Sequence, residues 1–447
     1  MVNKGAGEGD PATAGAWSAL GGAAGDAAAV RYRGGSGLGG GPLPVREMAR
    51  ATVGVCALAA AELGAARAGR ALSDGAAPVV DEGAVATAFV SERHLRIQGR
   101  EPVSFAPLSG FWRTADGWVR THANYPHHRT ALVRALGVAP TAEALREAMA
   151  GRAAREVQEL VYGAGGLAVA VAAEYGEPQP LVERVPGRAG AGRDLGPAPA
   201  GRPAAGVRVL DLTRVIAGPV ATRTLGLLGA DVLRIDPPGL PESDDAYADT
   251  GFGKRSAALD LGAAEDRTVF EKLLADADVV VRGYRPGALE RYGLGTRELL
   301  ERRPGLVVAE LCAWGPHGPW AGRRGFDSLV QAGYGISARY AGPDGTPGAL
   351  PAQALDHGTG YLVAAGVLRA LAGGGGLGLA FSLAGTASWL VREVPSAGDP
   401  EAGYEPGPWL RESASGYGPL RHAASPFGDW PTGPSRWGTD RAAWLPA

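Results

Sequence analysis

The sequence predicts an α/β protein in which a parallel-sheet domain is joined to a smaller α+β region. The first observation is a regular alternation of strand-like and helix-like segments across residues 207–312. The second is a different pattern over residues 43–186, where a helical run at 46–68 leads to a hairpin-like pair at 110–123. Strands that alternate with helices form parallel sheets through right-handed crossovers.

The alternation in residues 207–312 can be followed segment by segment. The order is strand VRVLDL (207–212), helix GPVATRTLGLLG (218–229), strands ADVLRI (230–235) and SAALDL (256–261), helix AEDRTVFEKLLADA (264–277), strand DVVVRGY (278–284), a helix from Pro286, and strand LVVAELC (306–312). Ligands of such sheets bind beyond the carboxyl ends of the strands. The residues directly after each strand are therefore the first candidates for a functional site.

In the smaller region, the segment GFWRTADGWVRTHA (110–123) is the expected hairpin. Helices at 128–137, 141–150 and 152–163 are expected to follow it. Its turn is Ala115-Asp116-Gly117, and an Asp-Gly pair favours a type I′ or bulged turn. We therefore expect a short antiparallel sheet followed by helices.

Composition divides the remaining chain. Residues 1–42 are rich in Gly and Ala and end in GGSGLGGGP, which predicts a flexible leader rather than a phosphate-binding loop, because no strand precedes the glycines. Residues 187–206 are rich in Gly, Pro and Ala and predict an interdomain linker. Residues 393–447 contain many Pro, Gly and Trp residues with little periodicity, so we expect a tail that packs on the body. The domain of central interest is then 207–392.

Charge and cysteine content exclude several classes. The 447 residues carry 44 Lys and Arg against 46 Asp and Glu, a net charge of −2, which argues against a nucleic-acid partner. Two cysteines, Cys56 and Cys312, exclude a disulfide scaffold and a cysteine-based zinc site. The start lacks an apolar signal region, and the apolar run 51–66 contains Glu62 and is short for a membrane span. We expect a cytoplasmic protein without membrane association.

Common catalytic signatures are missing from the sequence. No GxGxxG follows the first strand, and there is no Walker loop, GxSxG or HExxH. His127 and His128 are adjacent near a helix start, and neighbouring residues on a helix face different directions. We interpret them as a surface pair and predict no metal site.

Five segments occur in an order that resembles a known family. They are RVLDLTRVIAGPVATRTLGLLGADVLRID, GKRSAALDL, ADVVVRGYRPGALERYGLG, GFDSLVQAGYG and ALDHGTGYLVAAGVLRAL, all within 207–392. This series is similar to the successive motifs of the class III CoA-transferases, the formyl-CoA and carnitine CoA-transferase family. The resemblance implies a Rossmann-like domain plus a small domain, dimers that interlock, and CoA and acyl-CoA as substrates with no metal.

The resemblance also implies a nucleophile, Asp356, in the phrase LDHGTG. Its carboxylate would attack the thioester of an acyl-CoA, and an aspartyl-CoA thioester would then pass CoA to a carboxylic acid. Backbone N–H groups of Gly358 and Gly360 are candidates for stabilising the oxyanion. The alternative is that Asp356 only caps a helix, a position where Asp is favoured.

CoA contacts follow from the same comparison. Six residues match family positions that contact CoA. They are Val215, Ile216 and Ala217 in the loop after the first strand, the aromatic Tyr284 after a later strand, and the basic Arg291 and Arg324. Without the resemblance, each arginine would be interpreted as a solvated surface charge. Gly283 departs from the family, which usually has Asn there.

The N-terminal half resembles a truncated second copy in permuted order. REMARATVGVCALAAAELGAARAGR is similar to the helix that contains Asp356, and SGFWRTADGWVRTHANYPHHRTALVRALG is similar to the entry of the small domain. Alignment places Arg50 opposite Asp356, so we expect one active site per chain. The protein would be a homodimer or an intrachain pseudo-dimer.

Two other functions stay open. One is a 2-methylacyl-CoA racemase or epimerase, which would need a His where this chain has Phe326 in Gly325-Phe326-Asp327. The other is a CoA-binding or scaffold protein without catalysis.

Overall fold

The computed structural model describes residues 9–35, 37–103, 105–188, 190, 192–398 and 404–446. The residues outside this description are 1–8 and 36 of the expected leader, 104 of the smaller region, 189 and 191 of the expected linker, and 399–403 and 447 of the expected tail.

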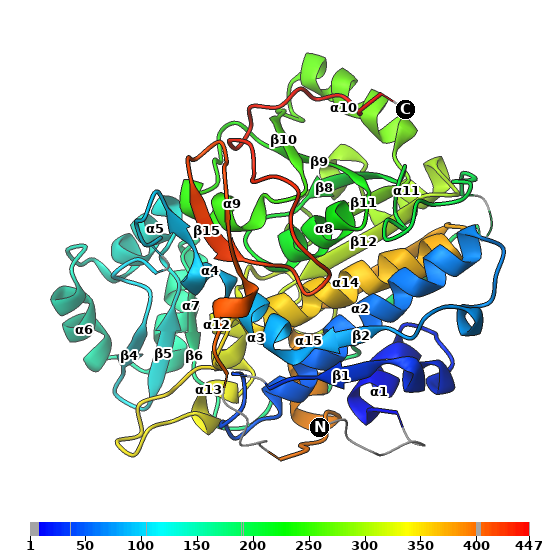
Figure 1. The fold of residues 1–447 in the computed structure, drawn as a ribbon. Helices are drawn as coiled ribbons and strands as arrows, with labels where there is room; N and C mark the ends of the chain where they lie inside the picture. Colours follow the sequence, from blue (N-terminus) through cyan, green and yellow to red (C-terminus); the bar gives the residue numbers. More distant parts are fainter. Residues whose placement is uncertain are drawn as a thin grey trace.

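A seven-stranded sheet forms the centre of the molecule (Figure 1). Its order is β10-β9-β8-β11-β12-β13-β7, and all strands are parallel except β7 at one edge. The bounds are β7 Glu183–Pro186, β8 Arg208–Leu212, β9 Asp231–Asp236, β10 Arg255–Ala258, β11 Val279–Arg282, β12 Val307–Cys312 and β13 Leu377–Ser382. The predicted parallel sheet over 207–312 is confirmed. Strand order reverses between β8 and β11, which is where doubly wound sheets open a crevice for ligands.

Helices cover the sheet and link its strands. Their bounds are α1 Pro11–Ala19, α2 Val45–Arg67, α3 Glu82–Phe89, α4 Ser91–His94, α5 Pro126–Leu136, α6 Ala142–Ala150, α7 Ala154–Gly163, α8 Ala217–Leu227, α9 Asp244–Thr250, α10 Ala264–Asp276, α11 Thr296–Arg302, α12 Asp327–Gly333, α13 Ile336–Arg339, α14 Ala354–Ala372 and α15 Leu383–Arg392. Short 3-10 turns occupy Ala24–Ala29, Leu72–Asp74, Glu290–Tyr292 and Gly407–Trp409.

The segment expected to be a flexible leader is folded over most of its length. Asp10 caps α1 by accepting the N–H of Thr13 at 3.0 Å, and Trp17 is fully buried. The guanidinium of Arg369 lies 4.2 Å from the Trp17 ring centroid. The prediction was wrong because the Gly and Ala content of this segment hid one capping residue and one large apolar anchor.

Two successions of elements in the chain have the same order. In the first, the parallel pair β1 (Arg31–Arg33) and β2 (Val79–Asp81) flanks α2, and Asp81 caps α3. In the second, β12 and β13 flank α14, and Ser382 caps α15. Helices α2 and α14 lie side by side (Figure 1). By length and composition α2 could cross a membrane, but 67% of its most apolar stretch of 18 residues is buried inside the protein.

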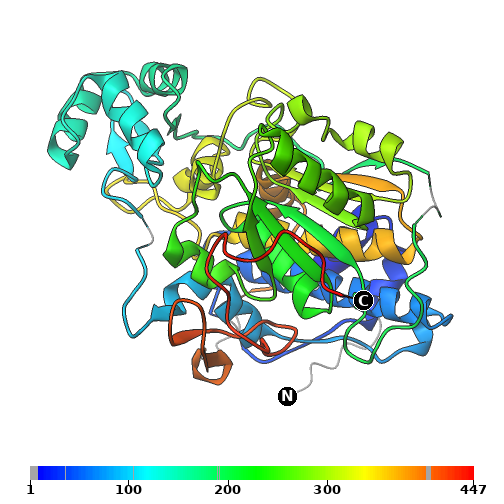
Figure 2. The ribbon, with the colours of Figure 1, turned by 90° about the horizontal axis from the view of Figure 1, so that it is seen from above.

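The smaller α+β region projects from the body at one side (Figure 2). Its antiparallel sheet has the order β4-β5-β6, with β4 Phe111–Arg113, β5 Trp118–Thr121 and β6 Ala168–Ala170, and α5–α7 pack nearby. The predicted hairpin is present, but none of residues 114–117 has a positive φ, so a type I′ turn is wrong. Asp116 instead accepts the N–H of Ala154 at the start of α7, at 2.7 Å.

The expected linker is held in place along the body rather than being a loose connector. Arg193 forms an ion pair with Asp278 at 2.7 Å and donates to the carbonyl oxygen of Gly206. Arg67 of α2 donates to four carbonyl oxygens of this segment, those of Leu195, Gly196, Pro203 and Ala205.

The C-terminal segment crosses the body and ends beside α10, where Trp444 donates to the carbonyl oxygen of Leu273 at 3.1 Å (Figure 1). Strands β14 (Leu410–Ser413) and β15 (Leu420–Ala423) form a small sheet with β3 (Arg96–Ile97). A short strand of the N-terminal half and two strands of the C-terminal segment therefore meet in one sheet.

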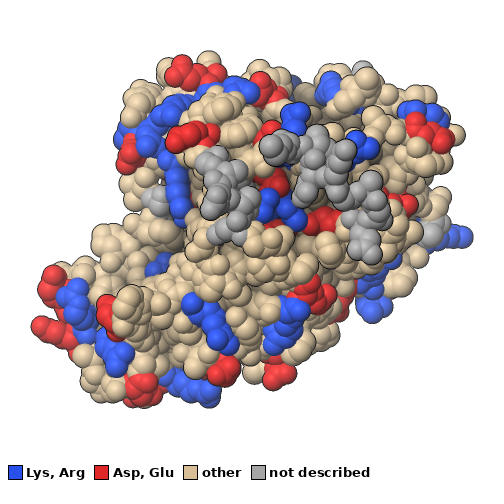
Figure 3. Space-filling view, turned by 60° about the horizontal axis from the view of Figure 1, so that its bottom comes forward, with Lys and Arg blue, Asp and Glu red and all other residues tan. Residues whose placement is uncertain are grey.

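Charged side chains of both signs are interspersed on the face of the molecule seen in Figure 3. Exposed ion pairs contribute about 0–1 kcal/mol each to stability.

The buried contact between helices α8 and α14 is of greater weight for the site, because both helices begin there. A Cβ added to Gly360 would lie 2.6 Å from the carbonyl oxygen of Ala217 and 2.8 Å from the Cβ of Val220.

We therefore expect Gly360→Ala to lower the free energy of unfolding by about 1–3 kcal/mol, because the two helix backbones must move apart. Urea unfolding monitored by circular dichroism measures the change. Gly163→Ala at the end of α7 is the matched control, since its Cβ would meet no atom within 4 Å, and it should stay within about 1 kcal/mol of wild type. Equal stabilities for the two variants would contradict this role of Gly360.

Candidate active site

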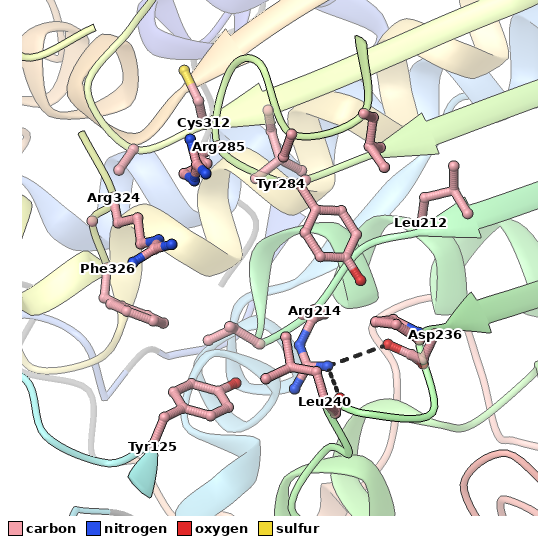
Figure 4. A pocket seen from close by; sticks show the side chains of 18 of the residues that line it. Tyr125, Leu212, Arg214, Asp236, Leu240, Tyr284, Arg285, Cys312, Arg324 and Phe326 are labelled. Carbon is pink, nitrogen blue, oxygen red and sulfur yellow. Dashed lines mark hydrogen bonds and ion pairs between the residues drawn. The ribbon is translucent and has the colours of Figure 1, made fainter. Parts of the chain in front are cut away.

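A cavity of about 420 Å³ opens at the carboxyl ends of β8 and β11 (Figure 4). Three parts of the chain line it: the loops after the sheet strands, the beginning of α14, and the region around α5. The structure brings six of the predicted residues to this cavity, namely Val215, Ala217, Tyr284, Arg291, Arg324 and Asp356. It lies where the strand order reverses, as expected for a ligand site of a doubly wound sheet.

The loop after β8 is organised by the buried carboxylate of Asp211. One oxygen accepts the N–H of Thr213 at 2.9 Å, and the other accepts from the hydroxyl of Thr222 at 2.6 Å and the ammonium of Lys254 at 3.1 Å. Burial lowers the pKa of Lys254 to about 8, although Asp211 opposes that shift. These bonds leave the loop little freedom beside the cavity.

Val215 in this loop has a φ of +71°, which a β-branched residue rarely adopts. Strained backbone of this kind clusters at ligand sites, where the surrounding structure enforces it. Ala217, the first residue of α8, also lines the cavity, whereas Ile216 does not and packs against the core.

Three exposed arginines at the cavity have no ion pair with any carboxylate of the described residues: Arg285, Arg291 and Arg324. The guanidinium of Arg291 lies 4.7 Å from the ring centroid of Tyr292. Burial, together with the like charge of Arg285, lowers the pKa of Arg324. Uncompensated positive charges that converge on one cavity favour an anionic ligand.

Arg214, which also lines the cavity, is compensated instead. It lies 3.6 Å from Asp236 (Figure 4). It also lies 3.4 Å from Glu242. Glu242 in turn accepts from the hydroxyl of Tyr125 at 2.9 Å, and the Arg214 guanidinium lies 5.6 Å from the Tyr125 ring centroid. This network joins the smaller α+β region to the loop after β9, at the wall of the cavity.

Asp356 lies in the first turn of α14 and is only 6% exposed. The residue at the cap position is Gln353, and Asp356 does not cap the helix with its side chain. Its own N–H donates to the carboxylate of Asp327 at 2.9 Å, and Leu355 also donates to Asp327. Asp327 therefore performs the capping, which leaves the Asp356 carboxylate without a hydrogen bond to any described residue.

Burial raises the pKa of Asp356 well above its usual value, and the nearby Asp327 and Glu92 raise it further. Burial also raises the pKa of Asp327 to about 6, against the hydrogen bonds that it accepts. A carboxylate in such a site is poorly solvated when ionised. Displaced pKa values of this kind are typical of reactive groups.

The two glycines expected to supply oxyanion donors lie elsewhere in the helix. Gly358 and Gly360 follow the first turn, so their N–H groups belong to the regular i to i−4 bonding of α14. Their role in the structure is close packing: Gly358 faces Met48 and Thr52 of α2, and Gly360 faces α8. The prediction was wrong because the sequence does not show how many residues of α14 precede them.

Sequence reasoning missed the contribution of the smaller region. His128 is only 4% exposed and lines the cavity, while its neighbour His127 is exposed at the rim. The expectation of a surface pair holds only for His127, since adjacent helical residues point in different directions. His122 stacks on Phe326 with centroids 3.8 Å apart. The aromatic and histidine content of HANYPHH was the available signal.

No group of three or more His, Cys, Asp and Glu side chains is placed to hold a metal ion in the part of the chain that the structure describes. Cys312 lines the cavity, and burial raises the pKa of its thiol to about 11.

Comparison with known proteins finds one family that part of the chain resembles. Residues 205–409 match the sequence profile of CoA-transferase family III. The chain is 35% identical over 183 residues to the probable fatty acyl-CoA transferase Rv3272 of Mycobacterium tuberculosis, covering 38% of this chain and 46% of that protein. It is 34% identical over 177 residues to the formyl-CoA:oxalate CoA-transferase of Streptomyces coelicolor, covering 37% and 43%.

A third relative is the succinyl-CoA–L-malate CoA-transferase beta subunit of Chloroflexus aurantiacus, 36% identical over 182 residues, with 38% of this chain and 45% of that protein covered. A crystal structure of Rv3272 aligns with a TM-score of 0.39 and 33% identity over 42% of this chain and 55% of that one. The chain spans less than half the length of these three curated relatives. Residues 205–409 are therefore similar in sequence to CoA-transferase family III.

Proposed function

We propose that this protein transfers CoA from an acyl-CoA to a free carboxylic acid, with Asp356 as the nucleophile. The observation that carries the proposal is the position of its carboxylate, which lines the cavity without a hydrogen bond to any described residue. Three uncompensated arginines lie at the same cavity, so a polyanionic thioester would find both charge partners and a nucleophile. The relatives named as CoA-transferases support the same chemistry.

CoA would lie across the crevice between β8 and β11. Its phosphates would contact Arg291 and Arg324, which donate charge-assisted hydrogen bonds. The loop at Val215 and the ring of Tyr284 would contact the rest of the nucleotide and lead its thioester toward Asp356. Gly283 contributes no side chain there, and the like-charged Arg285 adds to the attraction for phosphate.

The reaction would proceed through covalent steps. The Asp356 carboxylate attacks the thioester carbonyl, and CoA leaves as a thiolate, which gives a mixed anhydride. The thiolate then attacks the carbonyl carbon of Asp356, releasing the first acid and forming an aspartyl-CoA thioester. A second carboxylate reverses this sequence and leaves as the new acyl-CoA. Burial favours the first step, because attack removes a poorly solvated charge from the carboxylate.

The smaller region completes the site in this proposal. Residues 43–186 would occupy the position of the family's small domain, since Tyr125, His127 and His128 reach the cavity from that segment. The side-by-side packing of α2 and α14 supports an intrachain pseudo-dimer, with a homodimer as the alternative. At the position opposite Asp356, Arg50 forms ion pairs with Asp10 and Glu82, which supports a single active site per chain.

Phe326 favours CoA transfer over racemisation. A racemase needs two groups that exchange protons at the carbon next to the thioester, and one of them is a His at the position of Phe326 in the racemases that resemble this family. A phenyl ring cannot exchange a proton, and here it stacks on His122 instead.

We expect Asp356→Asn to reduce transfer by at least about 10³-fold, because an amide keeps the shape of the side chain but is not an anionic nucleophile. Product acyl-CoA is measured by chromatography over a panel of acyl-CoAs and free acids. Hydroxylamine added after acyl-CoA should trap residue 356 of the wild type as a hydroxamate, detected by mass spectrometry of the peptide.

Asp327→Asn is a useful comparison, since it alters the capping of α14 but leaves the nucleophile in place. It should form the hydroxamate at residue 356, whereas Asp356→Asn should not. Transfer by Asp356→Asn at the wild-type rate would remove the central residue of the proposal and leave a CoA-binding protein.

A second prediction concerns the arginines. Arg291→Ala and Arg324→Ala should each weaken CoA binding by about 1–3 kcal/mol, or about 5- to 150-fold in Kd, because each loses a charge-assisted contact with phosphate. Isothermal titration with CoA measures the change. Arg302→Ala, at an exposed arginine on α11 outside the cavity, should leave the Kd unchanged. Unchanged affinity in both cavity variants would place CoA elsewhere.

The raised pKa of Asp356 gives a pH prediction. In the unfolded chain this carboxyl ionises near pH 3.8, but in the folded protein it ionises only at higher pH. The stabilisation of the folded state by the protonated Asp356 carboxyl is therefore lost as pH rises from about 4 through the folded-state pKa. Asp356→Asn should melt at a higher temperature than wild type at pH 8 and at a similar temperature at pH 4. A difference in melting temperature that does not change with pH would contradict the raised pKa.

A further inference from the structure

Four side chains form a wall of the cavity that we call the imidazole wall: His122, Tyr125, His128 and Phe326. The His128 ring meets the Phe326 ring edge-on at 6.0 Å and the Tyr125 ring edge-on at 5.7 Å. His122 lies parallel to Phe326 at 3.8 Å. Tyr125, His128 and Phe326 line the cavity directly, and Figure 4 shows Tyr125 and Phe326 on the same side of it.

Three residues of the imidazole wall line the same cavity as Asp356. Phe326 precedes Asp327 in the chain, and Asp327 accepts the N–H of Asp356 at 2.9 Å. In this proposal, an acyl group whose thioester carbonyl is at Asp356 would lie toward this wall. Arg285 and Arg291 follow β11, whereas Arg324 lies two residues before Phe326 and close to the wall (Figure 4).

His128 is buried but unsatisfied within the described chain. The ring is 4% exposed, and neither Nδ1 nor Nε2 has a hydrogen-bond partner. An unpaired buried polar group costs about 1–3 kcal/mol. A phenylalanine at this position would make the same ring contacts without that cost. The two ring nitrogens therefore form hydrogen bonds only when a ligand supplies the partners.

Burial and neighbouring charges both lower the pKa of this imidazole. Burial lowers the pKa of His128 to about 3, and His127 and Arg324 lower it further. Burial also lowers the pKa of His122 to about 3, with His128 and Arg120 contributing. A neutral imidazole offers one N–H donor and one acceptor nitrogen, so it suits an oxygen-bearing group rather than an alkyl chain.

We propose that His128 is a specificity-determining residue that donates a hydrogen bond to an oxygen on the acyl group of the substrate. The site would accordingly prefer acids that carry a hydroxyl or a second carboxylate over plain alkyl acids. This inference rests on the proposed CoA transfer and adds the chemical class of acid. A long alkyl chain would instead leave both ring nitrogens buried and unpaired against methylene groups.

The test uses three acyl donors of similar size: succinyl-CoA, 3-hydroxybutyryl-CoA and butyryl-CoA, each with acetate as the common acceptor. Formation of acetyl-CoA by the full-length protein gives kcat/KM. For the wild type we expect at least one oxygen-bearing donor to exceed butyryl-CoA by about tenfold or more. Whether the hydroxyl or the carboxylate donor is preferred identifies the source of the oxygen.

His128→Phe retains the aromatic packing and removes both nitrogens. It should lower kcat/KM for the preferred oxygen-bearing donor by about 10- to 100-fold and change that for butyryl-CoA by less than about threefold. His128→Gln restores a donor and an acceptor and should recover part of the loss. His317→Phe, at an exposed histidine outside the cavity, is the matched control and should behave as wild type for all three donors.

The outcomes separate this inference from the proposed function. No preference among donors in the wild type, or an equal loss for all three in a folded His128→Phe protein, would overturn the role of His128 while transfer itself stands. If His128→Phe does not fold, as judged by its melting curve, the wild-type preference and His128→Gln decide the question. Failure of every donor and acceptor pair, with no label at Asp356, would refute the proposed function.

Discussion

The carboxylate of Asp327 fixes the beginning of α14, and the site depends on that one interaction. Buried N–H groups at a helix start need acceptors, and here the acceptor comes from a different helix, α12, rather than from a capping residue in α14 itself. Gln331 also contacts Asp327 and accepts the N–H of Leu350, so the chain leading into α14 is held by the same cluster. Asp356 is thereby placed in the first turn with its own carboxylate unused.

Burial sets the chemistry of that carboxylate. Asp356, Asp327 and Glu92 lie near one another, and burial together with mutual repulsion holds the pKa of Asp356 high. The same feature that destabilises its ionised form would favour attack on a thioester, because bond formation disperses the charge. The cationic side of the cavity, in contrast, is formed by exposed arginines at the rim, where phosphates can remain partly solvated. The cavity thus has a buried end at Asp356 and an exposed, positively charged end at the arginines.

Segments from both halves of the chain meet at this cavity. The hydroxyl of Tyr125 joins the smaller region to Glu242, and Arg214 and Arg234 hold Glu242 within the sheet domain. At the far edge of the sheet, β7 pairs with β13 and ties the same half of the chain to the central sheet. The halves therefore meet at the site, where His122, Tyr125 and His128 of the smaller region pack against Phe326 of the sheet domain to form the imidazole wall.

The sequence alone determined the parallel sheet and the strand series from 207 to 312, since hydrophobic periodicity depends only on local residues. Its ordered motifs also singled out residues that line the cavity. It also singled out Asp356. It could not show that Asp327 takes over the capping, that Gly358 and Gly360 serve helix packing, or that residues 10–33 are folded, because each depends on contacts between segments far apart in the chain. The burial of His128 and the raised pKa of Asp356 are likewise products of tertiary structure: both follow from what surrounds a side chain in space, which its neighbours in sequence do not specify.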